Sequence, residues 1–265
     1  MEQEQLNEPK MQVHPSIFKV IEQRKALKER LSNIKHKIGV YSAKGGVGKT
    51  TTAVNIAYTL SLMGYKVGLL DADVDCPNLT MFLGINAVKE AVYPLIPIEK
   101  DGVKVLSTAM FLDDKSKPII WRGPMIGKMI SEFFSNTEWG NLDYLILDLP
   151  PGTSDSPLSI IQLLDLDGFV IVTTPQHISA VNAIRSGMMA KRLGVALLGV
   201  IENMSDGEAR GGKEVAAELD SEVIGLVPFD KKMSEMSDRG EVAVLNDEGI
   251  KNRYEHIVKK LIGGG

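Results

Sequence analysis

The stretch YSAKGGVGKTTTAVNIA, which begins at Tyr41, constrains this chain more than any other part of the sequence. It follows a short β-branched run and leads into a stretch with helical character. A glycine-rich turn between a strand and a helix is typical of a phosphate-binding loop. The usual pattern, G-x-x-x-x-G-K-[ST], requires a first glycine where Ala43 stands, and the loop holds a second lysine, Lys44, besides the expected Lys49. The sequence therefore predicts a phosphate site and raises the question of what the extra lysine does.

Short apolar runs without in/out alternation recur along the chain, and helical stretches lie between most of them. The runs span 38–42, 66–71, 103–108, 143–150, 168–174, 197–203 and 222–228. The helical stretches span 50–63, 123–135, 156–164, 178–193, 211–219 and 248–262. Strands buried on both faces of a parallel sheet have such runs. We therefore expect an α/β fold, a doubly wound, mostly parallel sheet with helices on both faces.

Two segments are predicted along the chain. Residues 1–36 form an N-terminal extension with a helix over 16–35, for which Ser16 is a candidate N-cap. Residues 37–265 form a single domain built on the phosphate-binding loop. The predicted helix has apolar residues on one side and many charges on the other. We interpret it as an arm laid on the domain, and a partner-binding helix is the alternative.

Composition narrows the classes of protein that this chain can belong to. Of its 265 residues, 44% are hydrophobic, which is enough for one large core, and the formal net charge is −4. No nucleic-acid partner is expected from that charge. The acidic start MEQEQLNEPK does not resemble a secretory signal, and Cys76 is the one cysteine, so we expect a cytoplasmic protein without an internal disulfide.

The loop itself predicts which atoms hold the phosphates. Glycines let backbone N–H groups approach phosphate oxygens, and the helix N-terminus adds partial positive charge. Lys49 is expected to reach the β- and γ-phosphates, and the Thr50 hydroxyl to ligate Mg²⁺. A dinucleotide fingerprint is excluded, because Thr51 stands where its third glycine would be. The residues expected to bind nucleotide here are Ala43, Lys44, Gly45, Gly46, Val47, Gly48, Lys49, Thr50 and Thr51.

Acidic residues follow two of the predicted strands. The stretch LLDADVD places Asp71, Asp73 and Asp75 at the carboxyl edge of the sheet, where they can hold magnesium-bound waters or orient an attacking water. The apolar run LILDLPPGTSD closes on Asp148, as in a Walker B strand, and we expect this carboxylate in the Mg²⁺ site. Gly152 follows in a loop whose N–H is a candidate sensor of the γ-phosphate. Solvated loop carboxylates are the alternative, and for Asp75 we favour it.

The run KGGVGKTT is similar to the deviant Walker A motif of the MinD/ParA/NifH class of P-loop ATPases. In that class the early lysine, here Lys44, reaches across a dimer interface to the partner's nucleotide. The resemblance implies a homodimer across the nucleotide site, with Lys44 and Lys49 both catalytic, and closure timed by the γ-phosphate. It also implies slow basal turnover that waits for a protein partner. A solvated loop lysine is the alternative for Lys44.

Longer stretches resemble the Mrp/ApbC branch of that class, the iron–sulfur cluster carrier ATPases. They are GLLDADVDCPNLTMFLG, IIWRGPM, LDYLILDLPPGTSD, VTTPQ and GVIENMS. By this resemblance Asp73 positions the attacking water, Asp71 assists near Mg²⁺, Asn203 reads the adenine edge and Pro228 lies near the base. Trp121 and Arg122, in contrast, are assigned to structure or subunit contact rather than to chemistry.

The chain departs from the carriers just after Asn203. Many carriers have a C-x-x-C pair there, whereas this chain reads MSDGEARGGKEVAAE. A dimer would offer two copies of Cys76, and an all-cysteine four-iron cluster needs four thiolates. Cys76 is thus the one candidate ligand, and an ordinary loop cysteine is the favoured interpretation. His177 is interpreted as structural or solvated.

Two other functions fit the same loop. The first is a positioning or scaffolding ATPase of MinD/ParA type without an iron–sulfur cargo. The tail NRYEHIVKKLIGGG bears on it, since a basic amphipathic end can touch an anionic membrane. We favour the tail as the closing helix of the core and regard membrane contact as the minor alternative. A small-molecule ligase is the second function, and the WRGPM stretch argues against it.

Overall fold

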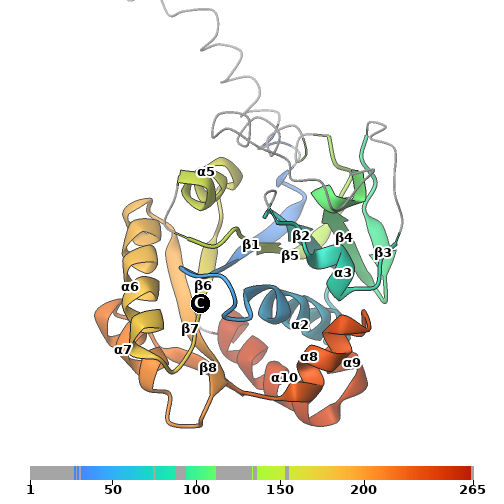
Figure 1. The fold of residues 1–265 in the computed structure, drawn as a ribbon. Coiled ribbons are helices and arrows are strands. Elements are labelled where there is room, and N and C mark those ends of the chain that lie inside the picture. The colour runs from blue at the N-terminus through green and yellow to red at the C-terminus, as the bar shows by residue number, and fades with distance from the viewer. Residues whose placement is uncertain are drawn as a thin grey trace, which may run out of the picture.

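The computed structural model describes residues 27, 29, 31–73, 76–86, 94–111, 133, 136–152 and 155–263. Within these residues the chain forms one sheet in the order β3-β4-β2-β5-β1-β6-β7-β8 (Figure 1). The strands are β1 (Ile34–Tyr41), β2 (Val67–Asp71), β3 (Ile98–Lys100), β4 (Val103–Ser107), β5 (Leu142–Asp148), β6 (Gly168–Thr173), β7 (Ala196–Ser205) and β8 (Val223–Pro228). All neighbouring pairs are parallel except β3 and β4. The predicted fold class is confirmed.

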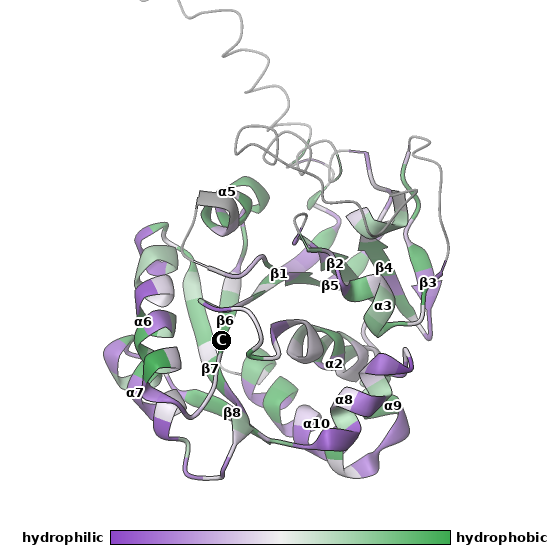
Figure 2. Ribbon diagram, in the orientation of Figure 1, coloured by the Kyte–Doolittle hydropathy of each residue, from purple (hydrophilic) through white to green (hydrophobic). Residues whose placement is uncertain are grey.

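Helices cover both faces of this sheet. They are α2 (Lys49–Leu62), α3 (Leu79–Phe82), α5 (Asp155–Leu164), α6 (His177–Arg192), α7 (Arg210–Glu218), α8 (Lys231–Asp238), α9 (Ala243–Asn246) and α10 (Glu248–Gly263), with the 3₁₀ helix η1 (Thr108–Phe111). Figure 1 shows α6 and α7 on one face and α2 with α10 on the other. Figure 2 colours β6 mostly green, as expected for hydrophobic residues, and β2 and β6 are buried along their whole length.

The seven predicted strands correspond to every strand except β3. This three-residue strand pairs antiparallel with β4 at the edge of the sheet, and it is too short to produce a recognisable pattern. The short helices α3, α8 and α9 were also not predicted, since four to eight residues carry little periodicity. The helix expected over 123–135 lies outside the described residues apart from Phe133.

The boundary between extension and domain differs from the predicted one. The structure begins β1 at Ile34, three residues before the predicted start of the domain, so Ile34 and Lys35 are strand rather than the end of the predicted helix. Ile34 pairs in register with Leu142 of β5, and this pairing overrides the helical spacing at that point. Leu27, Glu29 and Leu31 are helical, and Leu27 and Leu31 are buried in the core cluster, while residues 16–26, 28 and 30 of the predicted helix lie outside the described residues.

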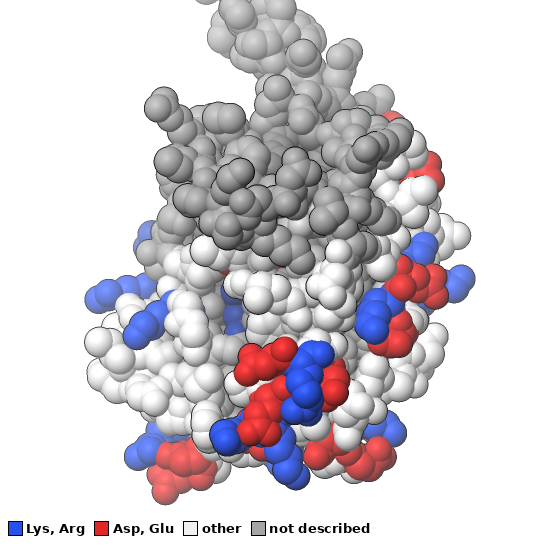
Figure 3. Space-filling view, turned by 45° about the vertical axis from the view of Figure 1, so that its right-hand side comes forward, with Lys and Arg blue, Asp and Glu red and all other residues white. Residues whose placement is uncertain are grey.

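The C-terminal helix α10 completes the core. Ile250, Tyr254, Ile257, Val258 and Leu261 are buried, so the apolar side of the tail packs inside the protein, as the favoured interpretation predicted. No helix among the described residues is long and apolar enough to cross a membrane. In Figure 3, basic and acidic side chains are interspersed over the lower and right-hand parts of the visible face, while only basic side chains are seen on its left.

Candidate nucleotide site

The predicted site residues converge at the carboxyl edge of the sheet. The loop after β1 opens α2, while Asp71 and Asp148 are the last residues of β2 and β5. Asp71 is in register with Asp148 on one side and with Ser107 on the other. Parallel strands bring their carboxyl ends to one edge, so residues far apart in sequence meet under the loop.

Lys49 is buried beneath the loop and paired with Asp148. Its Nζ lies 2.5 Å from Asp148 Oδ1, and the side chains are 8% and 2% exposed. The Thr50 hydroxyl donates to the other oxygen, Asp148 Oδ2, at 2.6 Å. One carboxylate thus holds both the predicted phosphate-binding lysine and the predicted magnesium-binding threonine. Incoming phosphates would take over the lysine that Asp148 holds here.

Gly48 and Asn203 are packed against each other. Gly48 has a φ of 85°, and a Cβ there would lie 2.0 Å from Asn203 Nδ2. The Asn203 amide donates to the Val47 carbonyl at 2.8 Å. Asn203 comes from the end of β7, where it is in register with Val227, the neighbour of the exposed Pro228. The structure thus places Asn203 directly under the loop as a brace.

Asp71 organises the segment that follows β2. Its Oδ2 accepts from the Leu79 N–H at 3.1 Å and the Ser107 hydroxyl at 3.0 Å, and its Oδ1 accepts from the Asp73 N–H at 3.2 Å. Complete burial and the nearby Asp148 charge raise the pKa of Asp71 to about 7. Asp71 therefore fixes the turn that presents Asp73. Sequence reasoning missed Ser107, because a serine at a strand end has no distinctive pattern.

Asp73 is the second carboxylate of this segment. It is buried, at 8% exposure, and its Oδ1 accepts from the Cys76 N–H at 3.1 Å. Cys76 itself is exposed. Asp75, Trp121 and Arg122 lie outside the described residues. The predicted Asp71 and Asp73 are thus brought to one edge with Asp148.

Gly152 lies beside the start of the loop. Its N–H donates to the Ser42 carbonyl at 3.1 Å, and its own carbonyl accepts from the Tyr41 hydroxyl at 2.6 Å. The expected contact between the Gly152 N–H and a γ-phosphate therefore requires that the bond to Ser42 opens. Ser42 and Tyr41 were not predicted as site residues, since both read as ordinary strand residues.

The two loop lysines have opposite surroundings. Lys44 is exposed, whereas Lys49 is buried. Among the residues that the structure describes, no carboxylate lies within ion-pair distance of Lys44. The carbonyl of Lys44 accepts from the Ser42 hydroxyl at 3.0 Å, which fixes its backbone but leaves the ammonium in solvent.

The segment after Asn203 is held in place by hydrogen bonds to the buried Glu202. Glu202 is fully buried, and its carboxylate accepts from the Ser205 hydroxyl at 2.5 Å and the Gly212 N–H at 2.8 Å. These bonds tie the first turn of α7 to the end of β7. His177 is exposed and pairs with Glu214 at 2.9 Å, in agreement with its structural or solvated interpretation. No group of three metal-ligating side chains occurs within the described part of the chain.

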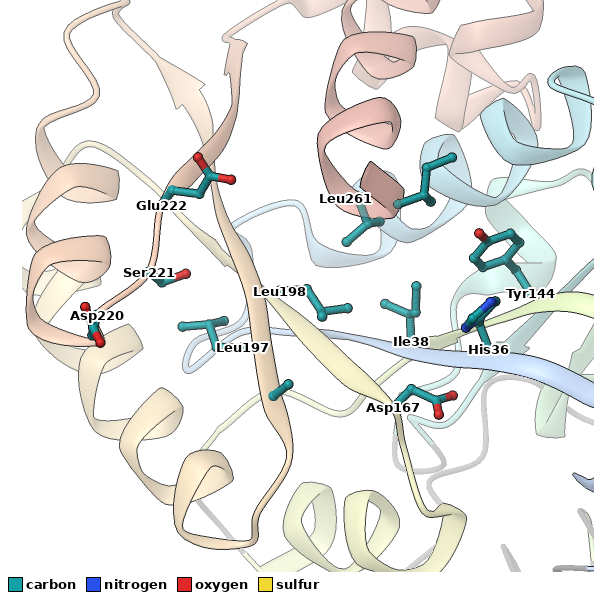
Figure 4. A pocket seen from close by; sticks show the side chains of 12 residues that line it. His36, Ile38, Tyr144, Asp167, Leu197, Leu198, Asp220, Ser221, Glu222 and Leu261 are labelled. Atoms are coloured by element: carbon teal, nitrogen blue, oxygen red, sulfur yellow. The ribbon is translucent and has the colours of Figure 1, made fainter. Parts of the chain in front are cut away.

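A cavity of about 610 Å³ lies at the other edge of the sheet, at the amino ends of the strands (Figure 4). Its lining includes Asp167, Asp220 and Glu222 around an apolar floor, with His36 stacked on Tyr144 at 5.0 Å between ring centroids. These carboxylates would repel phosphate. The glycine loop, rather than this cavity, is therefore the candidate nucleotide site.

The fold and this site define a class of protein. A parallel sheet whose first strand enters a glycine-rich loop and a helix, with a buried lysine, a threonine and a strand-end aspartate together, is that of a P-loop nucleoside triphosphatase. The oxygen donors of Thr50 and Asp148 suit Mg²⁺, and Lys49 with the loop N–H groups suits phosphates. The residues present therefore fit a nucleotide with Mg²⁺.

Comparison with known proteins identifies the family. The model of the ParA family described as NUBPL iron-transfer P-loop NTPase matches residues 33–262. An iron-sulfur cluster carrier protein of Methanocaldococcus jannaschii is 43% identical over 96% of this chain and 93% of its own length. The chain therefore belongs to this family of P-loop ATPases.

Two solved structures have the same fold. A nucleotide-binding protein of Archaeoglobus fulgidus, solved in complex with ADP, has a TM-score of 0.73 and 33% identity over 87% of this chain and 96% of that chain. MinD of Aquifex aeolicus, solved in a MinC:MinD cell division complex, has a TM-score of 0.68 and 25% identity over 86% of this chain and 96% of that chain. Both support the assignment of the ATPase fold.

Proposed function

We propose that this chain is a Mg²⁺-dependent, ATP-binding and ATP-hydrolysing homodimeric switch that acts in iron–sulfur cluster assembly. The observation that carries the proposal is the contrast between the two loop lysines. Lys49 is buried against Asp148 within its own site, whereas Lys44 is exposed on the same loop. An exposed lysine beside the phosphates has the position from which it can serve a nucleotide bound to a second copy of the chain.

Each residue has a role within one subunit. Mg²⁺, when bound, neutralises phosphate charge and orients the phosphates. Thr50 and Asp148 would hold the ion. The Lys49 ammonium would leave Asp148 and contact the β- and γ-phosphates. Asp73 would orient the attacking water, and Asp71 would keep the Asp73 turn in place through its bonds to Leu79 and Ser107. Asn203 and Pro228 stand at neighbouring strand ends, where the adenine would lie.

The second subunit would complete the site. Lys44 from the partner would add positive charge at the phosphates only when two copies close on ATP. Hydrolysis then removes the γ-phosphate that keeps the copies together, so dimerisation is timed by the nucleotide. Gly152 would take part if its N–H leaves Ser42 for the γ-phosphate.

The test of the switch is the variant Lys44→Ala compared with Lys49→Ala. We expect Lys44→Ala to bind ATP normally but to lose ATP-dependent dimerisation in analytical ultracentrifugation and most of its hydrolysis. Lys49→Ala should lose nucleotide binding itself. Normal turnover by a monomeric Lys44→Ala variant would show that the lysine acts only in its own subunit and would refute the dimeric switch.

The proposal of an iron–sulfur cargo is based on similarity to a carrier protein and on the number of cysteines. The M. jannaschii relative is named as an iron-sulfur cluster carrier. Here Cys76 is the one cysteine, and its N–H is bonded to Asp73 of the proposed hydrolytic turn. Two copies of Cys76 supply two thiolates, so we propose that a partner protein supplies the remaining cluster ligands.

Anaerobic reconstitution with iron and sulfide tests the cargo. We expect no stable cluster on the isolated chain, as measured by visible absorption and iron content, and the same result for Cys76→Ser. A stable cluster that Cys76→Ser abolishes would show that the chain carries its cargo alone. The ATPase readout is independent of this result.

A positioning ATPase of MinD/ParA type is the second candidate. The observation in its favour is the missing C-x-x-C pair, together with a MinD neighbour solved in complex with MinC. A positioning protein should redistribute in cells when ATP hydrolysis is blocked, for example by Asp73→Ala. Unchanged distribution of that variant alongside a defect in iron–sulfur enzymes would favour cluster assembly.

A further inference from the structure

A groove of about 640 Å³ follows the outer edge of the sheet at β8, which β6 and β7 separate from β1 and its glycine loop. Strand β8 forms its floor, with α7 on one side and α10 on the other (Figure 1). The floor is apolar, because Val223, Ile224, Leu226 and Ile257 line it. Gly225 permits this packing, since a Cβ there would lie 2.5 Å from Ile257 Cγ1.

The rim of the groove is cationic. Lys213 from α7 and Arg253, His256 and Lys260 from α10 line it, and none of its described lining residues is an aspartate or glutamate. Within the part of the chain that the structure describes, Lys213 and Lys260 have no carboxylate in ion-pair distance. The neighbouring Lys259, in contrast, pairs with Glu255 at 3.6 Å. The groove therefore favours the binding of negatively charged groups, although the net charge of the protein is −4.

The groove also exposes a strand edge. Among the residues that the structure describes, β8 is the last strand of the sheet and pairs on one side only, with β7. Its Leu226 carbonyl accepts from Arg253 Nη1 of α10 at 3.3 Å. A free edge of this kind is where an added strand can pair through its backbone.

We propose that this groove binds an extended, acidic peptide segment of a partner protein, which adds to the sheet beside β8. The peptide backbone would pair with β8, its apolar side chains would contact the floor, and its carboxylates would meet Lys213, Arg253 and Lys260. Arg253 would exchange the Leu226 carbonyl for a peptide carboxylate, which frees that carbonyl for the new strand. None of the residues that line the groove is among those that the ATPase proposal uses, and Leu226 stands two residues before Pro228 on β8.

The experiment begins with a peptide array probed with the full chain. The peptides, of about eight residues, combine Asp or Glu with Val, Ile and Thr in all orders, and equally long basic and neutral peptides are included. We expect the acidic, β-branched peptides to bind, with affinity that falls as salt is raised. The best peptide, labelled with fluorescein, then serves for fluorescence anisotropy. If no acidic peptide binds, the proposal is overturned.

Matched charge variants test the location. Lys213→Glu/Lys260→Glu should weaken peptide binding by about tenfold or more, because it reverses two rim charges. Lys232→Glu/Lys259→Glu changes the net charge equally at exposed lysines that do not line the groove, and it should change binding by less than about twofold. ATP hydrolysis should be the same in both. Equal losses in the two variants would show a general charge effect and overturn the groove.

Backbone methylation tests the pairing with β8. A strand bonds to a neighbour through alternate residues, so peptides N-methylated at odd or at even positions should differ. We expect one pattern to abolish binding and the other to retain it. Equal binding of both would exclude strand addition.

If an oligodeoxynucleotide or phosphatidylglycerol vesicles bind in place of the peptides, with the same sensitivity to Lys213→Glu/Lys260→Glu, the groove recognises another polyanion and the peptide proposal fails.

Discussion

At the scale of single residues, the site depends on one shared carboxylate. Asp148 is bonded to Lys49 and to Thr50, and its side chain is 2% exposed. A buried charge that loses its partner is costly, whereas a buried pair that is replaced as a whole is not. When no nucleotide is present, the effects of substituting Asp148 and Lys49 on the free energy of unfolding should therefore not be additive.

The prediction concerns the nucleotide-free chain. Lys49→Ala should lower the free energy of unfolding by about 3 kcal/mol, because Asp148 is left buried and unpaired. The double variant Lys49→Met/Asp148→Asn should recover most of that loss. Urea unfolding at pH 7 measures both. Additive losses in the double variant would contradict the coupling between the two side chains.

At the scale of elements, the turn between β1 and α2 depends on its contact with the end of β7. Gly48 has a left-handed φ, and the Asn203 side chain fills the space beside it. A side chain at residue 48 would be strained by the backbone and would also displace Asn203 from the Val47 carbonyl. The loop and β7 are thus one structural unit.

We predict that Gly48→Ala lowers nucleotide affinity by about tenfold or more, as measured by isothermal titration calorimetry, because the displaced Asn203 no longer braces the loop. Gly64→Ala is the control. Gly64 has a similar φ of 92°, but a Cβ there would have no neighbour within 4 Å. Gly64→Ala should lower the free energy of unfolding by about 1 kcal/mol and leave the nucleotide affinity unchanged. Similar affinities for the two variants would exclude the Asn203 brace.

At the scale of the whole molecule, α10 closes the core against α2 and β8. Tyr254 is fully buried there, and its hydroxyl makes no hydrogen bond of good geometry among the described residues, since the nearby Thr52 hydroxyl donates to the Gly48 carbonyl instead. Burial raises the pKa of Tyr254 well above its ordinary value. The hydroxyl of Tyr41, by comparison, is bonded to the Gly152 carbonyl.

We expect Tyr254→Phe to raise the free energy of unfolding by about 1 kcal/mol, because it removes a buried polar group without a partner. Tyr41→Phe should lower it by about 1 kcal/mol, because the Gly152 carbonyl loses its donor. Thermal and urea unfolding measure both changes. A destabilised Tyr254→Phe variant would mean that the hydroxyl has a partner in solution.

Much of this protein is determined by local sequence. Seven of its strands and the helices α2, α5, α6, α7 and α10 follow from apolar runs and helical spacing, because burial on both faces of a sheet leaves a local pattern. The strand–loop–helix unit with Lys49 and Thr50 is equally local, since its glycines, lysine and hydroxyl act within a few residues of one another. These features place the phosphate site without any tertiary information.

Only the tertiary structure decides which distant residues meet. Lys49 and Asp148 are 99 residues apart, and Asn203 reaches Val47 across 156 residues. Which strand lies beside which determines these partners, and sheet order is a long-range property that no local pattern encodes. The same holds for Ser107 beside Asp71 and for the cationic groove at the free edge of β8. The sequence by itself thus determines the phosphate loop and most of the elements, and the fold decides their partners.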